Sequence, residues 1–532
     1  MTAEPLSAAA DDAPDTTPPD APDTTPPDTP DTPDTDADAN ANADVDADAA
    51  RPEAPGTTRR SSWAALRPLV LRLHFYAGVL IAPFLLVAAV SGLLYAGSFQ
   101  AEKIVYDHEL RVPTGDTELP LSRQVAAARE AHPGGEISAV RPSPEDGATT
   151  RVLLSGVKGV DPGHTLAVFV NPYTGEVRGA LESYGSSGAL PLRTWVDELH
   201  RDLHLGETGR LYSELAASWL WVISGAGLVL WLARRFRGGA TRRAMRSAVL
   251  PDRSATGRRR TLSLHGSVGV WVALGLFFLS ATGLTWSTYA GAGVADLRSA
   301  LGQTTPAVSA TLDGDRSAGG GEHAGHGAGS DSMPGMDHGG SGGARHTGDV
   351  GLDTVLKAAR AEGLGNPVEI VPPSGPDQAY VVSQIQRSWP EKQDAAAVDP
   401  ATGEVTDVQR FADYPVLAKL TRWGIDLHTG NLFGLANQIA LAVLALALVL
   451  LIVWGYRMWW QRGRGSAFGR PVPRGAWREV SPYVLLPLAA AVAVLGYYLP
   501  LLGIPLAAFL VLDAVLGRIA GRRHAGSASA GG

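Results

Sequence analysis

Apolar residues along the chain are gathered in blocks that charged segments separate. Five blocks contain no Asp, Glu, Lys or Arg, namely residues 73–101, 215–233, 261–295, 427–456 and 480–512. A membrane-spanning helix needs about 20 predominantly apolar residues, so each block is long enough to cross a bilayer. Pro500 and Pro505 interrupt the last block and favour a hairpin of two short spans. The pattern predicts an integral membrane α-helical bundle of six spans, or of five if the last block is one kinked helix.

Arginine predicts the orientation of these spans. Residues 234–260 hold ten Arg against one Asp, and residues 457–479 hold six Arg against one Glu. By the positive-inside rule these segments and the N-terminus are cytoplasmic, and the two long segments between spans are extracytoplasmic. The expected location is the plasma or inner membrane. The predicted order is a tail (1–60), TM1 (69–98), external module 1 (102–198), TM2 (212–233), a basic loop (234–262), TM3 (264–290), external module 2 (296–426), TM4 (432–456), a basic loop (457–480), TM5 (482–499), TM6 (501–517) and a cytoplasmic tail (518–532).

Composition narrows the chemistry that the chain can perform. Residues 1–50 carry thirteen Asp and one Glu without Lys or Arg, so the formal charge of −8 becomes +6 for the remainder. This acidic Pro/Asp/Thr tail has too little apolar surface to fold and is expected to be disordered. The absence of cysteine excludes disulfides, cysteine-ligated iron–sulfur clusters and c-type haem attachment. Any redox centre must therefore be held by histidine, methionine or carboxylate.

The two external segments share one pattern. Each opens with a short amphipathic helical stretch, at 121–131 and 352–361, and continues through alternating strand-like runs. Each then reaches a proline–glycine turn, NPYTGEV at 171–177 and DPATGEV at 399–405. Proline sets φ and glycine supplies positive φ in such turns, which makes them hairpin signals. The pattern predicts two α+β modules of one kind.

Two of the apolar blocks begin with the same histidine motif. His74 is followed by glycine after four and eighteen residues, at Gly78 and Gly92, and His265 is followed likewise by Gly269 and Gly283. Eighteen residues make five helical turns, which places each histidine and its glycines on one face of a helix about 27 Å long. The glycines would allow a flat ligand to approach the backbone, although small residues are also common at ordinary helix contacts in membranes.

A second histidine motif follows each external module. It reads Asp-Leu-His-x-Gly and contains His204 in the first half and His428 in the second. An apolar span follows each copy, so the chain is a duplication of span, external module, histidine motif and span, with an added C-terminal hairpin. His200 lies four residues before His204 on the same helical face, so it is an alternative ligand, and a further alternative is that the two histidines hold a metal ion by themselves.

The duplicated combination of LHxxxG helices, D/N-P-x-T-G-E-V turns and DLHxG segments over residues 65–516 resembles the PepSY-associated transmembrane family, often labelled iron-regulated membrane proteins. The resemblance implies that the external modules are PepSY domains. Some members of that family are reductases that deliver electrons to ferric siderophores through b-type haems, so the resemblance also implies a membrane metal reductase.

The four histidines form two pairs under the predicted orientation. His74 and His265 lie at the cytoplasmic ends of their spans, and His204 and His428 lie at the external ends. Neutral imidazole is a common axial ligand of haem iron, and facing helices of a bundle supply opposed ligands. We therefore expect two haem b groups, one per pair. The alternative is that each histidine only presents its polar tip to lipid headgroups.

A glycine- and serine-rich insert at 319–346 interrupts the second module. It carries the imidazole and thioether groups that suit copper, and copper binding is the alternative to a neutral linker. The candidate ligands are His323, His326, Met333, Met336, His338 and His346.

Two functions of different classes follow from these observations. The first is a di-haem electron-transfer protein that reduces an extracytoplasmic ferric siderophore or cupric ion. The chain has no dinucleotide-binding G-x-G-x-x-G pattern, so its cytoplasmic-side donor would be a quinol or a separate reductase. The second is a non-redox protein whose modules capture copper or a protein partner. The expected partners of the protein are the lipid bilayer, a cytoplasmic-side electron donor and an external metal chelate or metal ion, and no nucleic acid.

Overall fold

The computed structural model describes residues 62–236, 249–312, 348–462 and 480–529. The predicted acidic tail, the His/Met-rich insert at 319–346 and parts of both basic loops lie outside these residues. The described helices outside the sheet region are α2 (Ser62–Leu80), α3 (Ala82–Val105), α4 (Asp107–Leu110), α6 (Pro191–Asp202), α7 (Glu207–Phe236), α9 (Gly257–Leu284), α10 (Thr288–Ala300), α12 (Val416–Thr429), α13 (Gly434–Arg462), α14 (Pro482–Tyr498) and α15 (Pro500–Ser529).

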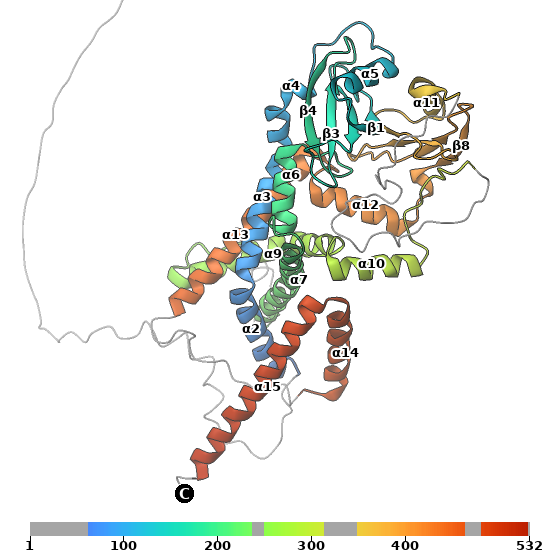
Figure 1. Cartoon of the computed structure of the whole chain (residues 1–532). Helices are drawn as coiled ribbons and strands as arrows, with labels where there is room; N and C mark the ends of the chain where they lie inside the picture. Colours follow the sequence, from blue (N-terminus) through green and yellow to red (C-terminus); the bar gives the residue numbers. More distant parts are fainter. Residues whose placement is uncertain (1–61, 237–248, 313–347, 463–479, 530–532) are drawn as a thin grey trace, which may run out of the picture. The chain divides into compact units, whose positions relative to one another are not determined.

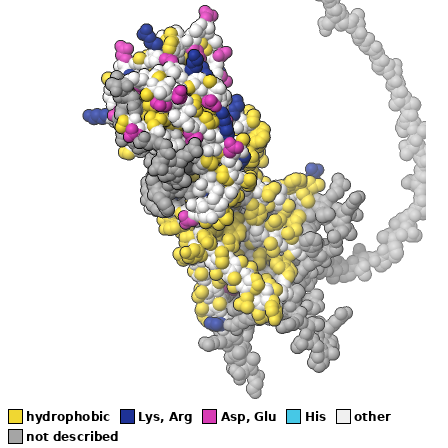
Figure 2. Space-filling view, turned by 90° about the vertical axis from the view of Figure 1, so that its right-hand side faces the viewer, with side chains coloured by type: hydrophobic (Ala, Val, Ile, Leu, Met, Phe, Trp, Pro, Cys, Tyr) yellow, Lys and Arg dark blue, Asp and Glu magenta, His cyan; other side chains and the backbone are white. Residues whose placement is uncertain are grey.

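Five described helices are long and apolar enough to cross a membrane. They are α3, α7, α9, α13 and α15, and their apolar side chains cover much of the surface of the helical part in Figure 2. The shorter α14 packs against α15 as a hairpin that turns at Leu499 (Figure 1). A Cβ added to Gly503 would come within 2.5 Å of the Gly496 Cα, so the close crossing of these two helices requires glycine. The chain is therefore a multi-pass membrane protein, and the sixth span stays a prediction.

The first span is not the single helix that the His74 motif predicted. It consists of α2 and α3, which are separated at Ile81. Pro83 causes the break because it has no N–H to donate to the carbonyl oxygen of Val79. The Tyr456 hydroxyl of α13 donates to that oxygen at 2.9 Å instead. In the second half the corresponding helix, α9, is continuous from Gly257 to Leu284.

A buried ion pair joins the start of the first span to the C-terminal hairpin. The Arg72 guanidinium lies 2.8 Å from the Asp513 carboxylate, and each side chain is 4 % exposed. The sequence predicts that Asp513 lies at the membrane interface, close to Arg518 and to the end of its span, and that position stays a prediction. The structure adds an ion-pair partner for Asp513 that is 441 positions earlier in the chain.

All eight described strands belong to one antiparallel sheet. The order is β4-β3-β2-β1-β5-β6-β7-β8, so each half of the chain contributes four strands and the halves meet at β1 and β5. The two predicted α+β units are therefore continuous with each other, and their identity as PepSY domains stays a prediction. The strands are β1 (Glu136–Arg141), β2 (Thr150–Ser155), β3 (Thr165–Val170), β4 (Val177–Ser183), β5 (Val368–Val371), β6 (Tyr380–Gln384), β7 (Ala395–Val398) and β8 (Val405–Gln409).

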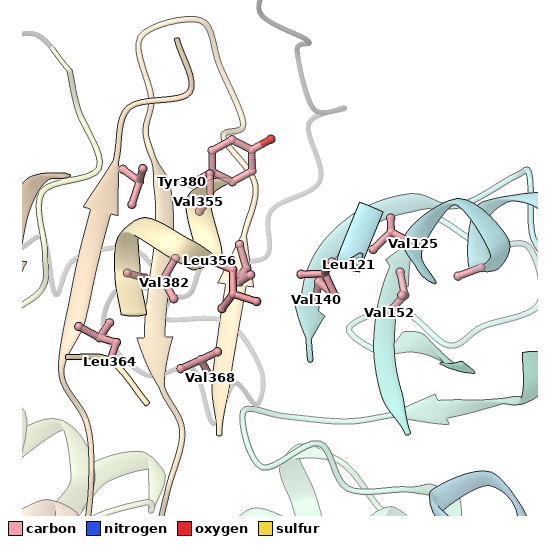
Figure 3. Packing of buried hydrophobic residues seen from close by; sticks show 14 of the residues in the cluster. Leu121, Val125, Val140, Val152, Val355, Leu356, Leu364, Val368, Tyr380 and Val382 are labelled. Carbon is pink, nitrogen blue, oxygen red and sulfur yellow. The ribbon is translucent and has the colours of Figure 1, made fainter. Parts of the chain in front are cut away.

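On one face of the sheet, α5 (Leu121–Ala131) packs on strands of the first half and α11 (Gly351–Ala361) on strands of the second half, and residues near α4 pack on the other face of the first half. Together α5 and α11 bury a common apolar core, part of which Figure 3 shows. Both helices lie where the amphipathic pattern predicts them. On the opposite face Phe169 and Leu190 pack with residues of α4. Glu102 near the end of α3 accepts bonds from the Leu190 N–H and the Arg193 side chain, which fixes α6 on the first span.

Candidate cofactor-binding site

His74 of α2 and His265 of α9 face each other in one cavity. Their ring centres are 6.4 Å apart and their planes make an angle of 74°. We call the surrounding space the His74 cavity. Its volume is about 1270 Å³, and α2, α7, α9 and α13 line it. The structure therefore brings together the first predicted histidine pair.

A backbone carbonyl of a neighbouring helix orients each of these imidazoles. His74 Nδ1 lies 3.0 Å from the Ile223 oxygen of α7, and His265 Nδ1 lies 3.1 Å from the Leu451 oxygen of α13. A carbonyl can only accept, so the neutral ring carries its proton on Nδ1 and leaves a lone pair on Nε2. Histidines that bind metal commonly have this arrangement.

Glycines give this cavity its space. Gly78 and Gly269, which the sequence motif singles out, both line it, and a Cβ on Gly78 would meet no atom within 4 Å. Gly227 lies against the histidine, since its Cβ would be 3.0 Å from the His74 Cε1. The wall of the cavity therefore has free space beside Gly78, whereas at Gly227 the backbone is in close contact with the His74 imidazole.

The second pair consists of His200 of α6 and His428 of α12. Both line another cavity of about 410 Å³, which we call the His200 cavity. His200 Nδ1 lies 2.9 Å from the Ser91 hydroxyl, and His428 Nδ1 lies 2.6 Å from the Thr282 hydroxyl. In each half of the chain, a hydroxyl of a long apolar helix thus bonds the second histidine of that half: Ser91 of α3 bonds His200, and Thr282 of α9 bonds His428.

The two hydroxyls can accept from these imidazoles because their own protons are used elsewhere. Ser91 donates to the Val87 carbonyl at 2.8 Å, and Thr282 donates to the Phe278 carbonyl at 2.7 Å. Each ring then donates from Nδ1 and keeps the Nε2 lone pair, as in the first pair. The hydrogen bonds that these four imidazoles make to other described residues all involve Nδ1.

The later glycines of the LHxxxG motifs lie beside the second pair of histidines. A Cβ on Gly92 would be 3.2 Å from the His200 Cε1, and a Cβ on Gly283 would be 3.7 Å from the His428 Cε1. These glycines therefore make room for an imidazole. Each of the two histidine-glycine segments therefore contributes to both cavities. Its histidine lines the His74 cavity, and its later glycine, Gly92 or Gly283, lies next to a histidine of the His200 cavity.

Burial keeps the second pair neutral. It lowers the pKa of His200 and lowers that of His428 to about 3, with His200 contributing to the second shift. Transfer to a low-dielectric environment disfavours the charged imidazolium. At neutral pH both rings can therefore offer a lone pair to a metal ion.

His204, which the DLHxG motif favours as the ligand, does not line the His200 cavity. Its backbone is left-handed, with φ of 56°, just after α6 ends. Its Nδ1 lies 3.2 Å from Glu198, its ring lies 5.1 Å from that of Trp195, and its side chain is 32 % exposed. The geometry favours the alternative, His200.

The sequence contains a signal for His200 that the short motif obscures. Asn171 and Asp399 begin the two turns and are separated by 228 positions, and the same separation relates Trp195 to Trp423. It also relates His200 to His428, whereas His204 is 224 positions before His428 and needs a four-residue gap. Aligning whole halves therefore identifies His200 without such a gap.

Four leucines separate the two cavities, and each of them lines both. They come from four helices and obey the repeat, because Leu85 and Leu276 are 191 positions apart, as are His74 and His265. Leu220 and Leu448 are 228 positions apart. We call Leu85, Leu220, Leu276 and Leu448 the leucine wall. These apolar side chains lie where the two cavities adjoin, and sequence motifs did not identify them.

Charged side chains line the His200 cavity on the side of the sheet region. Five arginines contribute, and carboxylates contact several of them: Arg422 lies 2.6 Å from Glu391, and Arg387 lies 2.6 Å from Asp426. Arg298 donates to the Gln303 carbonyl and the Thr305 hydroxyl, which are neutral acceptors. A ligand with anionic groups would find cations here. The five are Arg201, Arg210, Arg298, Arg387 and Arg422.

These residues fit bis-histidine haem. Two imidazoles that bind one metal ion from opposite sides, at about 2.0 Å each, place their ring centres about 6 Å apart, close to the spacing observed for His74 and His265. All four histidines line cavities, of about 1270 Å³ for the first pair and about 410 Å³ for the second, and cavities of several hundred Å³ are the size of small-molecule and cofactor sites. His74 and His265 would hold one haem and His200 and His428 the other. The predicted copper ligands of the insert, His323, His326, Met333, Met336, His338 and His346, lie outside the described residues.

A family model described as PepSY-associated TM region matches residues 71–462. This range includes all four histidines and both halves of the sheet. No curated protein matches the chain.

Proposed function

Because the chain belongs to the PepSY-associated TM region family, we propose that it transfers electrons across a membrane through two haem b groups. The final acceptor would be an extracytoplasmic ferric siderophore or cupric ion, and the role would be metal uptake or homeostasis. When bound, each haem iron would alternate between ferric and ferrous and so carry one electron. The chain itself would bind, orient and enclose the two groups.

One observation carries this proposal: the two histidine pairs line two adjacent cavities that share the four residues of the leucine wall. If the histidines only presented polar tips to headgroups, their rings would have no reason to face cavities between helices. If a single metal ion were held, two equivalent pairs would not be needed. Two adjacent cavities of this kind favour transfer from one cofactor to the next.

The arginine pattern supports a direction for the transfer. With the Arg-rich segments inside, the His74 cavity is on the cytoplasmic side and receives electrons from a quinol or a separate reductase. The His200 cavity then lies near the external sheet, where the acceptor would bind. Several basic residues, among them Arg234 and Arg259, line the His74 cavity, as expected for its end near the cytoplasm.

An absorbance spectrum tests the proposal. Protein purified from haem-replete cells should show a Soret band and, with dithionite, an α band of b-type cytochrome, with two haems per chain. His200→Ala should lower the haem content to one per chain, because it removes a ligand from one cavity only. His204→Ala is the matched control, since it changes a histidine four residues away that does not line the cavity.

Three results would oppose the proposal. A colourless wild-type protein would favour the non-redox alternative, in which the external region captures metal or a protein partner. Loss of haem from the His204 variant but not from the His200 variant would refute the assignment of ligands. A protein in which His265→Ala leaves both haems in place would refute the His74 pair.

A further inference from the structure

A second group of candidate metal ligands lies in the sheet region, apart from both cavities. Asp161, His164 and Glu182 each offer a ligand atom, and these atoms all lie within 4.8 Å of one another. Asp161 and His164 belong to the connection between β2 and β3, and Glu182 belongs to β4. Nothing in the haem proposal uses these residues.

A tight turn brings the first two ligands together. Pro162 and Gly163 occupy its central positions, with φ of 85° at the glycine, and the His164 N–H donates to the Asp161 carbonyl at 3.0 Å. Glycine tolerates this left-handed conformation, and proline fixes the φ that precedes it. The side chains at the two ends of the turn are thereby held on the same side of β4.

Glu182 is held in place by one oxygen and leaves the other available. Its Oε1 accepts from the Asp161 N–H at 3.1 Å, whereas its Oε2 is 3.8 Å from the His164 Nδ1. The other ring nitrogen, Nε2, is 3.8 Å from Glu198. Both separations exceed a hydrogen bond. His164 is only 11 % exposed, and its buried Nδ1 has no hydrogen-bond partner in the described part of the chain.

The 3.8 Å between His164 Nδ1 and Glu182 Oε2 suits two ligands that share one ion. Two ligand atoms about 2.1 Å from the same metal ion lie about 3 to 4.2 Å apart, depending on the angle between them. A buried nitrogen without a partner destabilises the folded state, and binding an ion would remove that penalty. We propose that Asp161, His164 and Glu182 bind a first-row transition-metal cation.

The incomplete ligand set indicates an exchangeable ion. One imidazole and two carboxylates leave coordination positions open, and the Asp161 side is exposed to solvent. Structural zinc sites are typically closed by four protein ligands. The mixed nitrogen and oxygen set suits iron, copper or zinc better than magnesium or calcium.

The position of the site relates it to the His200 cavity. The His164 ring lies 4.9 Å from the Tyr184 ring, and Tyr184 lines that cavity. The Tyr184 hydroxyl accepts from Arg201 at 2.6 Å, and Arg201 lines the cavity as well. One aromatic side chain thus separates the proposed ion from the cavity.

This inference rests on the proposed function and specifies where its substrate would bind. A ferric or cupric ion at the site would gain one electron and become ferrous or cuprous, while the haem iron in the His200 cavity changes from ferrous to ferric. No covalent bond forms or breaks in that transfer.

Isothermal titration of the full-length protein in detergent with Zn²⁺ tests the site, because zinc binds the same ligands and is not reduced. We expect His164→Ala combined with Glu182→Gln to lose one equivalent of zinc or to bind it at least tenfold more weakly. Glu182→Gln alone keeps an oxygen that can accept from the Asp161 N–H, so it should weaken zinc binding without disturbing the turn. The insert at 319–346 is present in every variant and contributes equally.

His108→Ala is the matched control. His108 also faces one carboxylate, with its Nδ1 3.7 Å from Glu109, but it belongs to no three-ligand group among the described residues. Zinc binding should be unchanged in this variant. Wild-type zinc binding in both Glu182 variants would overturn the site.

An absorbance spectrum of the same samples separates the two proposals. A normal Soret band with unchanged zinc binding in the variants refutes the metal site alone. An absent Soret band with zinc binding that depends on His164 refutes haem transfer and leaves a metal-capturing protein.

Discussion

The hydroxyl of Thr282 should control how tightly the His200 cavity retains its haem. It accepts the Nδ1 proton of His428 at 2.6 Å while donating to the Phe278 carbonyl. Thr282→Val keeps the branched shape but removes the acceptor. The imidazole N–H is then left without a partner in a buried place.

The expected size follows from this bond. An unsatisfied buried donor costs about 1–3 kcal/mol, and each 1.4 kcal/mol is a factor of ten in affinity. Loss of a partner that orients a metal ligand generally weakens binding by about 10- to 100-fold. We therefore expect one of the two haems to dissociate about 10 to 100 times faster from the Thr282→Val protein.

Transfer of haem to excess apomyoglobin, followed by absorbance, measures this rate. Thr421→Val is the control, because Thr421 lines the same cavity and bonds a carbonyl of its own helix, at Leu417, in the same way. Ser91→Ala, at the equivalent position of the first half, should also accelerate loss through His200. If both haems leave the Thr282 variant at the wild-type rates, the hydroxyl does not orient a ligand and the assignment of His428 fails.

Two further predictions concern stability. Asp513→Ala should lower the free energy of unfolding in detergent by about 3–5 kcal/mol, because it removes the carboxylate that lies 2.8 Å from the buried Arg72 guanidinium. Thermal unfolding should show a partial recovery in the double variant with Arg72→Met, and an unchanged midpoint in the single variant would contradict a stabilising pair. Burial raises the pKa of Glu391 from 4.5 to about 7, so this carboxyl binds a proton on folding between those pH values and the unfolding free energy should fall as pH rises through them. Denaturant titrations from pH 4.5 to 7 should show a smaller decline for Glu391→Gln, and an equal decline would show that this group is not responsible.

The sequence predicts the apolar spans well, because each block alone is long enough to cross a bilayer. It also predicts helices α5 and α11, whose amphipathic faces are local patterns. The single sheet could not be predicted, because the β1–β5 contact joins residues more than 200 positions apart and depends on tertiary packing. The break at Ile81 was predictable in principle, since Pro83 lies within the span.

The candidate site was predicted unevenly for a similar reason. The first histidine pair follows from a motif whose spacing is helical, so local geometry sufficed. The second pair depends on where α6 ends: at Leu203 and His204 the backbone becomes left-handed, which directs His204 away from the cavity. The short motif Asp-Leu-His-x-Gly contains no information on this change of backbone conformation. The constant separation of 228 positions between the two halves does identify His200 as the counterpart of His428. The acceptors for His74 and His265 are the backbone carbonyls of Ile223 and Leu451, and any residue type would supply such a carbonyl, so the sequence does not identify them.

The leucine wall gives the proposed transfer an electrical consequence. Aliphatic side chains offer no partners to water, protons or hydrated ions, so these cannot follow an electron past these leucines. An electron that passes the leucine wall would therefore move its negative charge without an accompanying proton or cation. Moving one charge across a full membrane changes the free energy by about 2.3 kcal/mol per 100 mV. With the His74 side facing a negative cytoplasm, the membrane potential itself would drive electrons outward, and dissipating that potential would slow external metal reduction without any change to the protein.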